Sequence, residues 1–190
     1  MIWNILYTIA PVAGGGILHM MVVRANLFAF LAVPLDGRRK IGGVRLLGDH
    51  KTWRGVLVIL AATMASAGVQ AWAESLQPHW ASWNLVDYQV IPWWRAGLWW
   101  GGGYVLAELP NSFLKRRAGI APGSSGPQGA RAVFLALMDQ ADSAIGCSLV
   151  AWLALGVALD AAFWMLVLGT AVHLLINMLL GLAGLRERMI

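Results

Sequence analysis

Five long apolar runs follow one another along the chain, separated by short segments that are richer in polar and charged residues. A helix that crosses a bilayer needs about 20 mostly apolar residues. The runs cover about 4–32, 55–75, 92–109, 131–157 and 161–184. This pattern predicts an all-α integral membrane protein with about five transmembrane helices, in a single domain over residues 1–190.

Polar and glycine residues interrupt the first of these runs. They are Gly14, Gly15, Gly16, His19, Arg24 and Asn26. Glycine tolerates many backbone conformations, so the run is compatible with a broken helix or with a span followed by a re-entrant piece. A polar residue inside a span marks a functional hypothesis, but the sequence assigns no role to His19 or Arg24.

The positive charges are distributed unevenly over the segments between the runs. The chain is 59% hydrophobic and 12% charged, with a net charge of +5. Under a five-span topology, 12 of the 14 Lys and Arg residues lie on one side, in two loops at 34–54 and 110–131 and in the C-terminal tail. Cytoplasmic loops carry such an excess, so we expect an N-out, C-in protein of the cell (inner) membrane. Because topology accounts for the basic excess, we expect no nucleic-acid partner.

A pair of carboxylates stands near the start of the fourth run. Asp139 and Asp142 are three residues apart, which places them on one face of a helix. Two unpaired carboxylates in hydrocarbon are costly, and Mg²⁺ with its preference for oxygen ligands would compensate them; the alternative is that they lie in interfacial water. Glu108 would either join this metal site weakly or pair with Lys115 or Arg116.

The segment "ELPNSFLKRRAGIAPG", residues 108–123, predicts a phosphate-binding element. Pro110 is expected to end the third span, so that Asn111 or Ser112 caps a short helix whose free N–H groups face an anion. Ser112, Lys115 and Arg116 would share one face of that helix. The alternative is that the three consecutive cations only set topology.

A second basic segment, "PLDGRRKIGGVRLLGDHKTWRG", covers residues 34–55. Lys51, Thr52 and Arg54 are candidates to bind a triphosphate or a lipid phosphate, although this segment also fits a role in topology alone. The pattern GxxxxGK(S/T) is missing, so the segment is not a P-loop. A glycine-rich stretch at 122–130 predicts a flexible loop that covers the nucleotide.

The last run contains "HLLIN", in which His173 and Asn177 lie four residues apart on one helix face. Such residues are usually satisfied between helices, and contact with the site is the alternative. The single cysteine, Cys147, has apolar neighbours, and no nucleophile motif is present. We therefore expect no covalent catalysis.

These segments, together with "MDQADSAIG" at 138–146, resemble the CDP-archaeol synthase family over nearly the full length of the chain. The resemblance implies that the protein condenses CTP with a lipid phosphate, using Mg²⁺, to give a CDP-lipid and pyrophosphate. The site residues implied are Lys51, Thr52, Arg54, Asn111, Ser112, Lys115, Arg116, Asp139, Gln140 and Asp142. One departure is "GDHK", with His50 where archaeal members commonly read "GENK", and this departure leaves the acceptor lipid open.

The expected partners are CTP and a lipid phosphate in the bilayer. The sequence is also compatible with a homodimer, in which a second copy of the chain is the partner. Asp139, Asp142, Lys115 and Arg116 are the expected catalytic residues. A small membrane transporter or a lipid-binding scaffold is the alternative, because the first run is interrupted. The clustering of acids and cations on the cytoplasmic side favours the enzyme, since a transporter site would lie nearer the midplane.

Overall fold

The computed structural model describes residues 1–120 and 130–184, and most of them are helical. The five long helices are α1 (Ile2–Arg24), α2 (Trp53–Leu76), α3 (Trp93–Arg117), α4 (Ala130–Ala154) and α5 (Leu159–Leu182). The short elements are the 3₁₀ helices η1 (Ala29–Leu31) and η2 (Pro78–Trp83) and the hairpin strands β1 (Lys40–Ile41) and β2 (Val44–Arg45). The prediction of a mostly helical protein is thus confirmed, and each of the five apolar runs overlaps with one of the long helices. Within the described residues, α1, α2 and α5 are long and apolar enough to cross a membrane.

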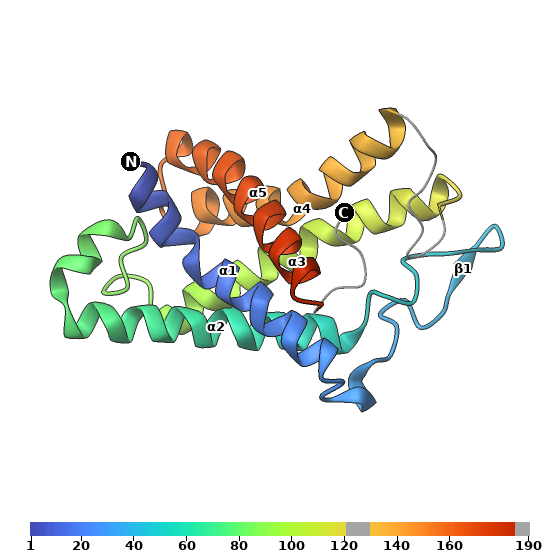
Figure 1. Ribbon diagram of the computed structural model, residues 1–190, viewed down its shortest axis with the longest axis horizontal. Coiled ribbons are helices and arrows are strands. Elements are labelled where there is room, and N and C mark those ends of the chain that lie inside the picture. The colour runs from blue at the N-terminus through green and yellow to red at the C-terminus, as the bar shows by residue number, and fades with distance from the viewer. Residues whose placement is uncertain (121–129, 185–190) are drawn as a thin grey trace.

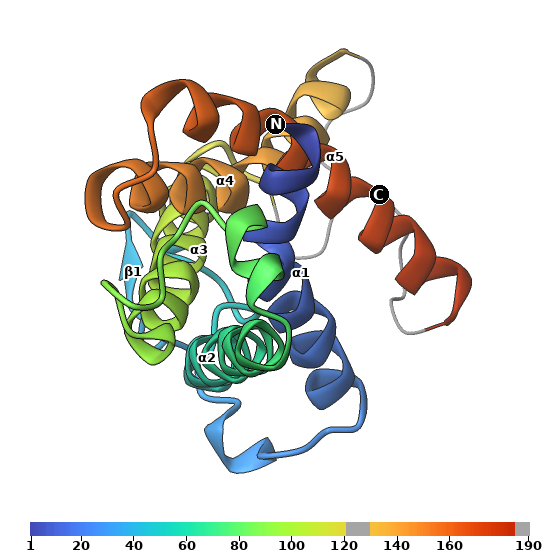
Figure 2. The same ribbon diagram turned by 90° about the vertical axis from the view of Figure 1, so that its left-hand side faces the viewer.

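Consecutive helices pack against each other, and α5 returns to contact α1 (Figures 1 and 2). Successive helices run in opposite directions across Figure 1, so that the end of α1, the start of α2 and the end of α3 lie toward the same side as the β1–β2 hairpin. The predicted loop at 122–130 lies outside the described residues except for its last position, as do the tail cations Arg186 and Arg188.

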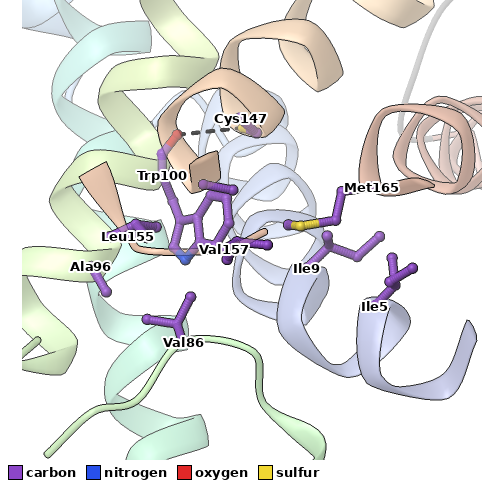
Figure 3. Close-up of a cluster of buried hydrophobic side chains, with 10 residues drawn as sticks. Ile5, Ile9, Val86, Ala96, Trp100, Cys147, Leu155, Val157 and Met165 are labelled. Carbon is purple, nitrogen blue, oxygen red and sulfur yellow. Dashed lines mark hydrogen bonds between the residues drawn. The ribbon is translucent and has the colours of Figure 1, made fainter. Parts of the chain in front are cut away.

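A hydrophobic core holds the opposite end of the bundle together (Figure 3). Trp100 of α3 is fully buried at its centre, and Cys147 of α4 donates an S–H hydrogen bond to the Trp100 carbonyl at 3.5 Å. Ile9 from α1 and Met165 from α5 complete the contact between the first and last helices. Between helices in a bilayer, close packing of such side chains stabilises the fold through van der Waals contact and not through removal of apolar surface from water. The core therefore fixes one end of the helices and leaves the hairpin end to form a site.

The first helix is continuous but shorter than its apolar run. α1 passes through Pro11 and the three glycines without a break. A methyl group on Gly15 would lie 2.5 Å from Thr63 Cγ2, so this glycine allows close approach to α2. The apolar run extends to about residue 32, but the helix ends at Arg24, because Asn26 and Phe28 have left-handed φ angles of 49° and 53° and turn the chain.

The third helix does not end at Pro110, which contradicts the prediction for this segment. α3 continues to Arg117, so Asn111 and Ser112 lie inside it and cap no helix. Proline removes one helical hydrogen bond, but interior prolines are tolerated in membrane helices that pack against neighbours. The extension also has tertiary support, since the Arg117 guanidinium donates hydrogen bonds to three hairpin carbonyls. These are Ile41 O (2.8 Å), Val44 O (2.9 Å) and Arg45 O (2.6 Å).

The crossing of α3 and α4 is closed by two facing glycines. A methyl group on Gly146 would lie 2.0 Å from Gly103 O, and one on Gly103 would lie 2.8 Å from Gly146 O. No side chain fits at this point without separating the two helices. The glycines therefore set the spacing between the helices that carry Asn111 and Asp139.

We expect Gly146→Ala to destabilise the protein, because the added methyl overpacks the α3–α4 crossing. Overpacking costs about 1–3 kcal/mol, and thermal unfolding in detergent measures the loss. Gly102→Ala is the matched control, since a methyl group there meets nothing within 4 Å. Equal melting temperatures for the two variants would contradict the close crossing.

Candidate functional site

A cavity of about 720 Å³ opens between the five long helices at the hairpin end of the bundle. Its walls include nearly every site residue predicted from the sequence. These are Lys51, Thr52, Arg54, Glu108, Asn111, Ser112, Lys115, Arg116, Asp139, Asp142, His173 and Asn177. Gln140 is the exception, and it reaches the cavity wall through Asn177. Residues from distant parts of the sequence thus converge on one space.

The two aspartates converge on a single atom of α3. Asn111 Nδ2 donates hydrogen bonds to Asp139 Oδ1 at 2.7 Å and to Asp142 Oδ2 at 2.8 Å. Lys115 forms an ion pair with Asp139. Asp142 is buried, whereas the Asp139 side chain is 45% exposed. The carboxylates therefore share a helix face, as predicted, and face the basic face of α3.

The chemistry of this pair fits a magnesium ion. Mg²⁺ is typically bound by one or two carboxylates, with water and substrate phosphates as its other ligands. Asp139 and Asp142 supply that number, and turning the Asn111 amide over would present its oxygen at the same point. Within residues 1–120 and 130–184, no three His, Cys, Asp or Glu side chains form a metal-binding cluster. A magnesium ion here would thus depend on the two aspartates and on substrate oxygens.

Glu108 lies one turn before Asn111 on α3, and it forms an ion pair with Lys51. The sequence instead suggested Lys115 or Arg116 as its partner, and that suggestion is wrong. Lys51 directly precedes α2, and this pair ties the loop before α2 to α3 across the cavity. The pair thereby holds the Lys51 ammonium in the polar wall.

The Arg116 guanidinium is buried in the cavity wall with donors that have no partner. Arg116 is only 8% exposed, and its Nε and Nη1 make no hydrogen bond within the described structure. Buried donors are almost always satisfied, and an unpaired buried charge is costly. A cation held in this way is suited to bind an anionic group that enters the cavity.

The start of α2 combines a capping residue with cations. The Thr52 hydroxyl oxygen accepts a hydrogen bond from Gly55 N at 3.2 Å, which caps the helix. Arg54 Nη1 donates to Asn26 Oδ1 at 2.9 Å, while Arg54 Nε is buried without a partner among the described residues. Thr52 therefore has a structural role here, and Arg54 retains a free donor.

Two further residues of α4 are held by α5. His173 Nδ1 lies 3.0 Å from Ser143 Oγ and 3.2 Å from Gln140 O, and Asn177 Nδ2 donates to Gln140 Oε1 at 2.5 Å. The predicted "HLLIN" face thus fixes α4 beside the aspartates. The sequence interpretation missed Ser143, whose only signal was a small polar residue directly after Asp142.

The sequence interpretation also missed Asp36, which organises the loop before α2. Its carboxylate accepts hydrogen bonds from Arg45 Nη2 (2.7 Å), Arg45 Nε (3.2 Å) and the backbone N–H groups of Arg38 (3.0 Å), Leu47 (3.1 Å) and Gly48 (3.5 Å). Burial alone would raise the pKa of Asp36, but these hydrogen bonds outweigh it and hold the pKa well below its ordinary range. The Asp-Gly pair at 36–37 was a turn signal, which gave no indication of this role.

We expect Asp36→Asn to destabilise the protein at neutral pH, because the amide cannot accept these hydrogen bonds as a carboxylate does. Hydrogen bonds to charged groups contribute about 1.5–3 kcal/mol. Since the pKa is lowered by folding, the contribution is complete above the unfolded pKa of about 3.9 and is lost as the pH falls toward the folded value. Melting temperatures of the two proteins should therefore differ most at pH 5–7 and converge below about pH 4. A constant difference across this range would contradict the role of the carboxylate charge.

The amino-acid sequence and the fold are both similar to those of known proteins, over most of the chain. A sequence profile of the family described as CarS-like, CDP-archaeol synthase, matches residues 12–189, a range that includes every site residue above. The CDP-archaeol synthase of Halobacterium salinarum is 33% identical over 81% of each chain. That of Methanosphaerula palustris is 29% identical over 81% of this chain and 87% of its own. A solved structure, described as an intramembrane enzyme for archaeal membrane lipids biosynthesis, superposes with a TM-score of 0.60 at 25% identity, covering 90% of this chain and 91% of the other.

Proposed function

The chain belongs to the CDP-archaeol synthase family, and from that membership we propose how its cavity performs the reaction. The protein is an enzyme that transfers a cytidylyl group from CTP to a lipid, giving a CDP-lipid. The observation that supports the assignment of the site is the meeting of two carboxylates with buried, unpartnered cationic donors in one cavity. The similarities do not favour a transporter or a scaffold.

The chemical difficulty of this reaction is repulsion between two anions. An oxygen of the lipid phosphate attacks the α-phosphorus of CTP, a new P–O bond forms, and the bond to the β-phosphate oxygen breaks to release pyrophosphate. Cations placed around the phosphates lower this barrier. We assign that role to Lys115 and Arg116 of α3 and to Lys51 and Arg54 beside α2, all of which line the cavity.

Asp139 and Asp142 are the residues that would hold the magnesium ion. When bound, the ion would neutralise charge on the phosphates and on the pyrophosphate as it leaves. The side chain of Asn111 bridges the two carboxylates, and Lys115 orients Asp139. These contacts keep both carboxylates directed at one point before substrates enter.

The position of the cavity supports a site on the cytoplasmic side of the cell membrane. The cavity is lined by Lys115 and Arg116, from the basic last turn of α3, and by Leu47 and Lys51 from the segment after the hairpin. Figure 1 shows that the C-terminal end of α3 and the hairpin lie at the same end of the bundle. Cytoplasmic segments carry the excess of Lys and Arg, and CTP is a cytoplasmic nucleotide. We therefore propose five spans, with the N-terminus outside and the C-terminus inside.

The test is product formation by purified protein with labelled CTP, Mg²⁺ and a panel of lipid phosphates. We expect a CDP-lipid and pyrophosphate with an ether-linked isoprenoid glycerol phosphate, and the panel includes phosphatidic acid as the competing acceptor. Omission of Mg²⁺ should abolish product formation. No product with any lipid, from protein shown to be folded, would contradict the proposal.

A further inference from the structure

One polar side chain interrupts the apolar wall that α1 contributes to the cavity. The α1 residues on this wall are Ile9, Val12, Ala13, Gly16, His19, Met20 and Val23. The structure describes α1 over its whole length, and His19 is the single polar side chain among them. A ligand with an apolar tail and a polar head could therefore place its tail along the apolar residues of α1 and its head beside His19.

The His19 ring directs an unpartnered nitrogen toward the start of α2. Its Nε2 atom is buried and makes no hydrogen bond within the described structure. A methyl group on Gly55 would lie 3.7 Å from that atom, which places Nε2 beside the first turn of α2. A buried donor or acceptor without a partner costs about 1–3 kcal/mol. A ligand that offered an oxygen to this nitrogen would recover that cost.

The charges around His19 are suited to an anion. The positive charges nearest to it are those of Lys51 and Arg54, beside the start of α2. The nearest negative charge is that of Glu108 on α3, which forms an ion pair with Lys51. Arg54 Nε is likewise buried and unpartnered. His19 and Arg54 thus line the same cavity, each with a buried nitrogen that has no partner among the described residues. The described structure pairs Lys51 with Glu108 but pairs Arg54 with no carboxylate, so the Arg54 charge is available to an anion.

We propose that His19 and Arg54 bind the phosphate of the acceptor lipid, with its chains along the apolar wall of α1. With its proton on Nε2, the imidazole donates to a phosphate oxygen, and Arg54 donates beside it. Asp139, Asp142 and Arg116 lie on the other wall, formed by α3 and α4, and are left for the triphosphate of CTP. This inference rests on the proposed function, because it divides one cavity between the two substrates of that reaction.

The test measures KM separately for CTP and for the acceptor lipid that gives product with the wild-type enzyme. We expect His19→Ala to raise KM for the lipid phosphate about tenfold or more, as the loss of one hydrogen bond to a charged group predicts, with KM for CTP changed less than about twofold. His19→Gln, which restores an N–H donor, should recover part of the loss. His79→Ala is the matched control, since His79 lies in η2 outside the cavity and should change neither constant.

Several outcomes would overturn the inference. A rise in KM for CTP alone would place His19 with the nucleotide, and an unchanged KM for both substrates would remove it from the site. If His19→Ala gives no product, thermal shift separates the causes: retained stabilisation by CTP with Mg²⁺, and lost stabilisation by the lipid phosphate, supports the subsite, whereas loss of both contradicts it. Absence of product from wild-type protein would instead overturn the proposed function, and this inference with it.

Discussion

Replacing Asp139 with Asn is expected to lower kcat/KM by about 10²–10³-fold, the usual effect of removing one preorganised electrostatic contact. The change deletes one of the two carboxylates that converge on Asn111 and removes the charge opposite Lys115. Asn has the size of Asp, and the Asp139 side chain is 45% exposed, so the change should leave the fold intact. Initial rates at a series of Mg²⁺ concentrations test this expectation, and the variant should need more Mg²⁺ for half-maximal rate.

Asp160→Asn is the matched control for this change. Asp160 is an exposed acid in the first turn of α5 and does not line the cavity. We expect its variant to keep the wild-type rate and the wild-type response to Mg²⁺. Retained turnover in Asp139→Asn, with an unchanged melting temperature, would show that the metal assignment is wrong.

Much of the site could be predicted because its residues stand at the ends of apolar runs. Alternating spans bring the end of one run and the start of the next to the same membrane face, so Lys51, Lys115 and Asp139 were expected to meet. The structure brings them together in one cavity. Helix periodicity also placed Asp139 and Asp142 on one face.

The failures came from interactions that local sequence does not contain. Pro110 predicted a helix end, but the hydrogen bonds of Arg117 to the hairpin and the packing of α3 between α2 and α4 extend the helix. The sequence left open where the first helix ends, and the left-handed residues Asn26 and Phe28 turn the chain after Arg24. Asp36 was missed because five hydrogen bonds from a folded loop define its role, and single-residue propensities do not predict such a set.

Replacing Arg116 with Met is expected to weaken CTP binding and to lower kcat/KM by about 10²–10³-fold, because a preorganised cation is lost from the phosphate site. Arg116 is buried, and two of its donor atoms have no partner in the described part of the chain. Arg116→Lys should recover part of the activity, since Lys keeps the charge but loses the two-pronged geometry that matches phosphate oxygens. Steady-state kinetics with CTP varied at saturating lipid measure both effects.

The melting temperature of the Arg116→Met variant shows whether Arg116 binds substrate or stabilises the fold. Replacing a buried charge that has a protein partner is destabilising, whereas replacing an unpaired one with an apolar side chain of similar size relieves its desolvation cost. Arg116→Met should therefore melt at the same or a higher temperature than the wild type while it loses activity and stabilisation by CTP. Arg95→Met, on the exposed N-terminal part of α3 and outside the cavity, is the control and should change none of these properties. A lower melting temperature for Arg116→Met with unchanged KM for CTP would show that Arg116 is a structural residue. Lys115 would then be left as the cation of α3 that binds the triphosphate of CTP.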